Sequence, residues 1–191
     1  MRYFFLENVD ISTGQVIISG DEYNHVVKVN RLEVGDQCFV IDGKGLRVMV
    51  RIDAVTKKEV KGTILSHEFV REQSGPMVIV CCALSRKGVF HTVVEKAVEL
   101  GAAVIVAIAS ERCVVKVEDE EAFVNKHTMT VREAMKQCHR TVAPLIKGPV
   151  SVAYLKDVVQ NADRRFLLDP SNGVLPKTVL QAARGKTFSP Q

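Results

Sequence analysis

The sequence predicts an α/β protein with an all-β N-terminal part. Three observations lead to this prediction: short β-type segments within the first 70 residues, a polar Gly–Pro break at 72–76, and apolar runs that alternate with helical patterns after it. Several short strands at close spacing indicate a small barrel in the first part. Continuous apolar runs in the second part indicate parallel strands that are covered on both faces. We therefore expect one domain over 1–72 and a second over 76–191.

In the first part, four segments combine β-branched residues with flanking turn residues. The run Asp42-Gly43-Lys44-Gly45 is a good hairpin turn, because glycine supplies the positive φ values that tight turns need. Asp21 precedes a short helical pattern over 22–27 and is a candidate N-cap. The expected strands are 16–18, 37–41, 47–52 and 60–65.

In the second part, the apolar run 77–84 predicts a strand, and a helix follows over about 90–100. Val93, Val94, Ala97 and Val98 form the apolar face of this helix, and Gly101 is a natural stop. The remaining expected elements are a strand over 103–109, a helix over 119–140, a strand over 165–168 and a helix over 176–184.

Charge and composition narrow the possible functions. The net charge is +4, and the excess of basic side chains lies after residue 75, which permits an anionic partner such as RNA but also fits a mixed solvated surface. The longest apolar runs are too short for a transmembrane helix or a secretory signal, so we expect a cytoplasmic protein. The five cysteines and five histidines form no C-x-x-C or clustered pattern. We therefore expect reduced, buried thiols and no metal site.

Cationic turns follow two of the predicted parallel strands. The run Ser85-Arg86-Lys87-Gly88 comes after the first, and Ser110-Glu111-Arg112 comes after the second. The carboxyl ends of strands line the ligand crevice of an open α/β sheet, so these cations could hold a phosphate or an RNA backbone. The alternative is a solvated connection with ordinary ion pairs. The usual dinucleotide and P-loop glycine motifs are missing from the sequence.

A polar stripe is expected on the helix over 119–140. Glu133, Gln137 and Arg140 stand at positions i, i+4 and i+7, within about 60° of one another on a helix. They could support a site, or they could belong to a solvated face in which Glu133 pairs with Lys136.

The first part contains a second cationic group. His25, Lys28 and Arg31 stand at a spacing of three, which would place them on one helical face in reach of a nucleic-acid backbone. A charged surface without a ligand is the alternative. We find no Ser/His/Asp or Cys/His arrangement typical of a nucleophilic hydrolase, and the catalytic residue stays unknown.

Several separated motifs resemble the RsmE family of bacterial 16S ribosomal RNA methyltransferases, which methylate N3 of a uridine. The matching segments follow the family's order over almost the whole chain, although Glu95 stands where the family commonly has glutamine. They are Asn24 to Arg31, Leu84 to Gly88, Val94 to Gly101, Ser110 to Cys113, and Glu133 to Arg140 with Pro144.

The resemblance implies a PUA-like β-barrel over 1–72 that helps to hold RNA and a SPOUT-type α/β domain over 76–191. It also implies a deep trefoil knot, a homodimer, S-adenosylmethionine as methyl donor, and 16S rRNA or the small ribosomal subunit as partner. The residues expected to face RNA or the donor are Arg86, Lys87, Arg112 and Arg140. Those expected to support them are Glu111, Glu133 and Gln137, and the barrel contacts to RNA are His25, Lys28 and Arg31.

The chain departs from the family pattern near its end. The glycine-rich donor loop, I-G-P-E-G-G, and the L-R-x-E-T-A element are not found before Gln191. We therefore expect the α/β domain to lack its C-terminal knot segment and its main donor-binding loop. The alternative to a methyltransferase is a non-catalytic RNA-binding fragment.

Overall fold

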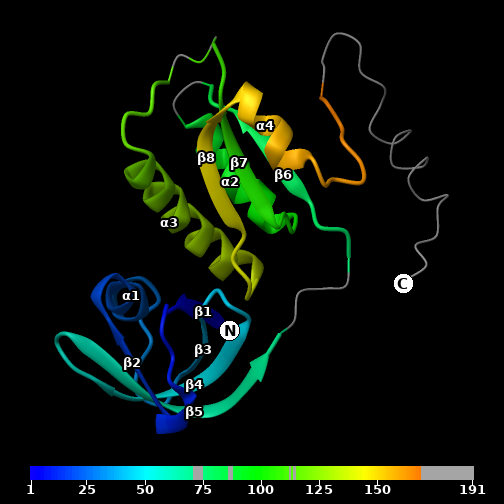
Figure 1. Cartoon of the computed structure of the whole chain (residues 1–191). Helices are drawn as coiled ribbons and strands as arrows, with labels where there is room; N and C mark the ends of the chain where they lie inside the picture. Colours follow the sequence, from blue (N-terminus) through cyan, green and yellow to red (C-terminus); the bar gives the residue numbers. More distant parts are fainter. Residues whose placement is uncertain (71–74, 86–87, 112, 114, 169–191) are drawn as a thin grey trace. The chain divides into compact units, whose positions relative to one another are not determined.

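The computed structural model describes residues 1–70, 75–85, 88–111, 113 and 115–168 (Figure 1). Residues Met1–Leu155 form one compact unit, and Lys156–Gln191 form a second. The first unit contains a five-stranded sheet and a separate three-stranded parallel sheet. The mixed α/β class predicted from sequence is therefore confirmed.

The N-terminal part is a curled five-stranded sheet with the strand order β1-β3-β4-β5-β2. Its pairs are antiparallel except for β1 with β3, which are parallel. The four strands predicted here are confirmed, and β1 is an addition to them. The bounds are β1 Arg2–Phe5, β2 Gln15–Ser19, β3 Gln37–Ile41, β4 Leu46–Val55 and β5 Glu59–Phe69, with a short 3-10 helix, η1, at Ile11–Thr13.

Alternation along the strands builds the core of this sheet. In β4, Val48, Val50 and Ile52 are buried on the inner face, whereas Arg47 and Met49 lie on the outer face. Gly62 in β5 is needed where the sheet curls, because a Cβ atom there would lie 2.6 Å from the Arg51 carbonyl oxygen. A glycine therefore allows the close approach of β4 and β5.

The segment between β2 and β3 begins with a short helix, α1 (Gly20–Asn24), and continues as a π-helix, η2 (His25–Val29). Ser19, and not the predicted Asp21, occupies the N-cap position. In η2 the amide of Asn30 donates to the carbonyl of His25 at 2.9 Å, an i→i+5 hydrogen bond. The predicted helix over 22–27 is thus present in a wider form.

The second sheet is parallel, with the order β6-β7-β8. Its bounds are β6 Ile79–Ala83, β7 Val104–Ala109 and β8 Leu145–Ser151. β7 lies in the middle and is the most buried strand, whereas β6 at the edge is half-buried. The predicted strands over 77–84 and 103–109 are confirmed, and β8 is an addition to them.

Two helices, α2 (Val89–Glu99) and α3 (Glu120–Cys138), accompany this sheet and match the predicted helices. Asp119 caps α3 by accepting a hydrogen bond from the amide of Ala122 at 2.9 Å. Val94 of α2 and Met135 of α3 are fully buried and share one apolar cluster with Ile105 of β7. The helices therefore bury their apolar faces in the core of the parallel sheet.

The end of α3 also packs on the N-terminal sheet. Phe5 of β1 and Ile41 of β3 belong to the same apolar cluster as Met135. The hairpin after β3 adds backbone contacts, since the amide of Ala143 donates to the Gly43 carbonyl at 2.8 Å. The predicted domain limits of 72 and 76 stay a prediction, because residues 71–74 lie outside the described part.

The C-terminal part differs from the prediction. A short helix, α4 (Val152–Val159), follows β8 and was not predicted. The predicted strand over 165–168 is wrong: these residues have no regular structure, and Leu167 and Leu168 are almost fully exposed. An apolar run forms a strand only where another strand can pair with it. The predicted helix over 176–184 lies outside the described residues.

The five cysteines are free, as expected. Cys38 is fully buried, but the expectation of burial is wrong for the other four, which are only half-buried: Cys81, Cys82, Cys113 and Cys138. Within the described residues, no helix has both the length and the apolar character that crossing a membrane requires.

Candidate functional site

The carboxyl edge of the parallel sheet brings together the two predicted turns after β6 and β7. Ala83 pairs with Ile108, and the amide of Leu84 donates to the Ile108 carbonyl at 2.9 Å, so Ser85 and Ser110 leave the sheet at the same edge. Ser151, at the end of β8, pairs with Ala109 at this edge as well. In an open parallel sheet, this edge is the place where ligands bind.

A hydrogen-bonded turn shapes this edge after β7. The Cys113 amide donates to the Ser110 carbonyl at 2.9 Å, and the Cys113 Sγ atom accepts from the Ser110 amide at 3.2 Å. The Ser110 hydroxyl lies 3.3 Å from the same sulfur. These hydrogen bonds from Ser110 lower the pKa of the Cys113 thiol. From sequence, Cys113 is expected to be a reduced, buried thiol, whereas the structure places it half-buried in this turn. Its hydrogen bonds with Ser110 could not be predicted from the sequence, because they depend on the shape of the turn.

Of the predicted residues at this edge, Glu111 is described and is exposed to solvent. Arg86, Lys87 and Arg112 lie outside the described residues. Their predicted contacts with RNA or the donor therefore stay a prediction.

Arg140 lies at the other end of β7. Its guanidinium donates through Nη1 to the Ala102 carbonyl at 2.6 Å and to the Val98 carbonyl at 3.5 Å. These carbonyls belong to the C-terminal end of α2 and to the loop before β7, where a cation also interacts favourably with the helix dipole. Arg140 therefore braces the helix end, and the structure does not bring it together with Glu111.

The predicted polar stripe on α3 takes a different form. Glu133 and Gln137 are exposed, and Glu133 pairs with Lys136 at 2.7 Å, which is the i, i+3 pair considered from sequence. The same ammonium contacts Glu22 Oε1 at 2.7 Å and His25 Nδ1 at 3.4 Å. The side chain of Lys136 is only 6% exposed, so this buried cation joins α3 to α1 and η2.

Three of these side chains, Glu22, His25 and Glu133, are possible metal ligands, and Lys136 is the fourth member of the group. Glu22, His25 and Glu133 offer ligand atoms that all lie within 4.8 Å of one another. Nζ of Lys136 contacts all three residues, so its positive charge takes the place that a metal cation would need. Sequence reasoning missed Glu22, because its partner is more than 100 residues away.

The predicted group of His25, Lys28 and Arg31 is divided in the structure. His25 faces Lys136, whereas Lys28 and Arg31 are exposed. A spacing of three does not define one face here, because η2 has the wider turn of a π-helix. Lys28 and Arg31 remain accessible to a polyanion.

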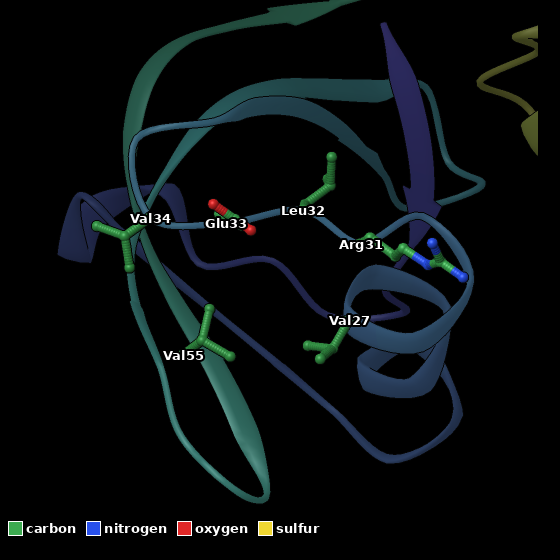
Figure 2. Close-up of a pocket in the computed structure, with 6 residues that line it drawn as sticks. All are labelled: Val27, Arg31, Leu32, Glu33, Val34 and Val55. Carbon is green, nitrogen blue, oxygen red and sulfur yellow. The ribbon is translucent and has the colours of Figure 1, made fainter.

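Arg31 lies at the rim of a shallow hollow of about 510 Å³ in the N-terminal sheet (Figure 2). Val27 and Val55 point toward one another across it, whereas the guanidinium of Arg31 extends away from them. Arg31 adopts the left-handed conformation, with φ of 53°, which is uncommon for a residue with a side chain. The other lining residues are Leu32, Glu33 and Val34.

Comparison with known proteins agrees with this architecture. Residues 72–189 match a family model described as an RNA methyltransferase domain, and residues 18–65 match an RNA methyltransferase PUA domain. The relatives include proteins named ribosomal RNA small subunit methyltransferase E. The one from Bacillus subtilis is 25% identical over 149 residues, which are 77% of this chain and 58% of the relative. The one from Aquifex aeolicus is 29% identical over 175 residues, which are 91% and 73% of the two chains.

A solved structure from Legionella pneumophila is also similar. It has a TM-score of 0.73 and 27% identity, covers 93% of this chain and 73% of its own, and contains bound S-adenosylmethionine. The chain spans less than two thirds of the length of the Bacillus subtilis relative. The family match covers more than half of the chain and agrees with the motifs found in the sequence. This chain therefore belongs to the RsmE-type family of proteins that carry this RNA methyltransferase domain.

Proposed function

We propose that the protein transfers a methyl group from S-adenosylmethionine to N3 of a uridine in 16S ribosomal RNA. The match of residues 72–189 to the RNA methyltransferase domain carries this proposal. The PUA match that precedes it supports RNA as the substrate. Because the methyltransferase match covers most of the second part, it favours an enzyme over the non-catalytic RNA-binding alternative.

The proposed place for the donor is the carboxyl edge of β6, β7 and β8. The exposed Glu111 carboxylate and the hydroxyls of Ser85 and Ser110 are groups that can hydrogen-bond to the ribose of the donor. When bound, the donor supplies a methyl group made electrophilic by its sulfonium. Arg86, Lys87 and Arg112 are proposed to face RNA or the donor at this edge.

The N-terminal sheet is proposed as a PUA-like domain over 1–72 that holds RNA, followed by a SPOUT domain from residue 76. The exposed cations Lys28 and Arg31 are suited to phosphate contacts. In this proposal Arg140 stabilises the end of α2 and the loop that follows, because its guanidinium donates to the Val98 and Ala102 carbonyls. A homodimer and a cytoplasmic location, where ribosomes are assembled, complete the proposal.

The chemistry requires alignment and proton removal. Uracil N3 carries a proton at neutral pH, so this proton must leave as the N–CH₃ bond forms and the donor's S–CH₃ bond breaks. The protein contributes by orienting the nitrogen toward the methyl group and by favouring its deprotonated form. A base within folded RNA must first leave its stack.

Two measurements test the proposal. Calorimetry with S-adenosylmethionine should show saturable binding by this chain, and labelled donor should transfer methyl groups to small ribosomal subunits or to naked 16S rRNA. RNA binding without donor binding would instead support the non-catalytic alternative.

The variant Arg112→Ala should weaken RNA or donor binding while leaving the thermal midpoint nearly unchanged. A large loss of stability would assign Arg112 a structural role.

A further inference from the structure

A column of contacting groups, tilted between Tyr3 and Phe39 and stacked between Tyr3 and His139, runs from the N-terminal sheet to the end of α3. Tyr3 of β1 and Phe39 of β3 are paired neighbours in the sheet, with ring centroids 5.0 Å apart. The ring of His139 stacks on Tyr3 at 4.1 Å with an interplanar angle of 16°. At the other end, the Arg47 guanidinium lies 5.3 Å from the Phe39 centroid and donates to the Tyr3 hydroxyl at 3.3 Å.

The two ends of this column differ. Arg47 covers Phe39, and Phe39 and Tyr3 are both half-buried. His139 is exposed, and Tyr3 is its ring neighbour among the described residues. The column therefore ends in an aromatic ring that is held from one side and faces solvent on the other.

The backbone of His139 supports a role for its side chain. His139 caps the C-terminus of α3 in the left-handed conformation, with φ of 62°. Glycine adopts this conformation without steric cost and is the usual residue at such a helix end. A strained non-glycine residue at an exposed helix end is a reason to look for a function of its side chain.

We propose that the column of Phe39, Tyr3 and His139 is a platform on which an unpaired RNA base stacks, with the His139 ring as the contact surface. This inference rests on the proposed RNA-methyltransferase function, which makes RNA the partner. Every base has a π-face, so such a platform binds an unstacked base without reading its identity. The platform lies beside Arg140, at the end of the parallel sheet opposite its carboxyl edge, and would therefore hold a nucleotide apart from the target.

Charge at the platform indicates that stacking, not phosphate contact, provides the binding. Arg47 pairs with Glu68, and Arg51 on the same strand pairs with Asp53. Cations that are already neutralised release few counterions from RNA, so their contribution to the salt dependence is small. The contribution of His139 should therefore change little between low and moderate salt.

The test uses the full chain and a short single-stranded RNA that contains 2-aminopurine, whose fluorescence falls when it stacks. Wild-type protein should quench the probe, and His139→Gly should bind roughly tenfold more weakly, as expected for the loss of one stacking contact. Because glycine favours the backbone conformation at this site, the thermal midpoint of His139→Gly should not fall. His139→Phe should retain the quenching, and His67→Ala, which removes an exposed histidine on β5, should behave like wild type.

Three results would each overturn the platform. The first is that wild type does not quench the probe, and the second is that wild type and His139→Gly quench it equally. The third is an equal loss of RNA binding in His139→Phe and His139→Gly. Methyl transfer to 16S rRNA is measured separately on the wild-type chain. Methyl transfer with equal quenching by wild type and His139→Gly overturns the platform alone. Quenching that depends on residue 139, without methyl transfer, overturns the proposed function and leaves the platform in place.

Discussion

The buried ammonium of Lys136 gives a quantitative test of how the two parts of the first unit are joined. Its side chain is 6% exposed, and that of its partner Glu22 is 16% exposed, with 2.7 Å between the charged atoms. The second carboxylate oxygen of Glu22 is buried and accepts no hydrogen bond from the described residues. The variant Lys136→Met would keep most of the apolar stem and leave this carboxylate without its cation.

We expect Lys136→Met to reduce the free energy of unfolding by about 2–3 kcal/mol. This is below the 3–5 kcal/mol typical of broken buried pairs, because Glu22 is not fully buried and Glu133 is half-exposed. Such a loss is a large fraction of the stability of an ordinary domain. Changing Glu22 to Gln in the same chain should restore part of it, since no buried carboxylate then remains unpaired.

Urea unfolding followed by circular dichroism measures the effect, and Lys96→Met is the matched control. Lys96 also pairs with two carboxylates, Glu95 and Glu99, but its side chain is 54% exposed, so solvent already screens its charge. Equal unfolding midpoints for the Lys136 and Lys96 variants would refute the reasoning. A failure of Glu22→Gln to restore stability would refute the assigned pairing.

Three further outcomes are expected. Gly62→Ala should lower the free energy of unfolding by about 1–3 kcal/mol in urea titrations, because the added methyl meets the backbone of β4, and an unchanged midpoint would contradict the packing. Cys113 should react with iodoacetamide at lower pH than an ordinary thiol, because hydrogen bonds from Ser110 lower its pKa. Cys38 should react only after unfolding, because burial raises its pKa to about 12. Mass spectrometry of the alkylated sites checks both expectations. Burial lowers the pKa of His127 below its unfolded value of about 6.5, so the unfolded chain takes up its proton first and stability should fall as pH drops from 7 to 5. His127→Phe should show a smaller fall in urea unfolding over this range, and an identical fall would show that other groups cause it.

The periodic elements could be predicted from the sequence because their patterns are local. The apolar face of α2, the helical pattern of α3 and the apolar run of β7 each depend on residues within a few positions. β1 and β8 were missed for a different reason. β1 is only four residues long, and β8 contains Gly148 and Pro149, residues that usually mark turns.

The candidate site was less accessible to sequence reasoning, because its contacts join distant segments. The Glu133–Lys136 pair could be considered from sequence since it spans one helical turn. The partnership of Lys136 with Glu22 and the stacking of His139 on Tyr3 could not, since both depend on how α3 meets the N-terminal sheet. The expected common face of His25 and Lys28 assumed an ordinary helix, and the π-helical turn of η2 separates these side chains.

The central claim is methylation of 16S rRNA at uridine N3, and nucleoside mass spectrometry tests it most directly. Small ribosomal subunits that lack this modification would be incubated with the protein and S-adenosylmethionine, and the extracted 16S rRNA would be digested to nucleosides. We predict that 3-methyluridine appears and that its appearance depends on both protein and donor. Unmodified uridine throughout, or a methyl group found only on another base or on the ribose, would contradict it.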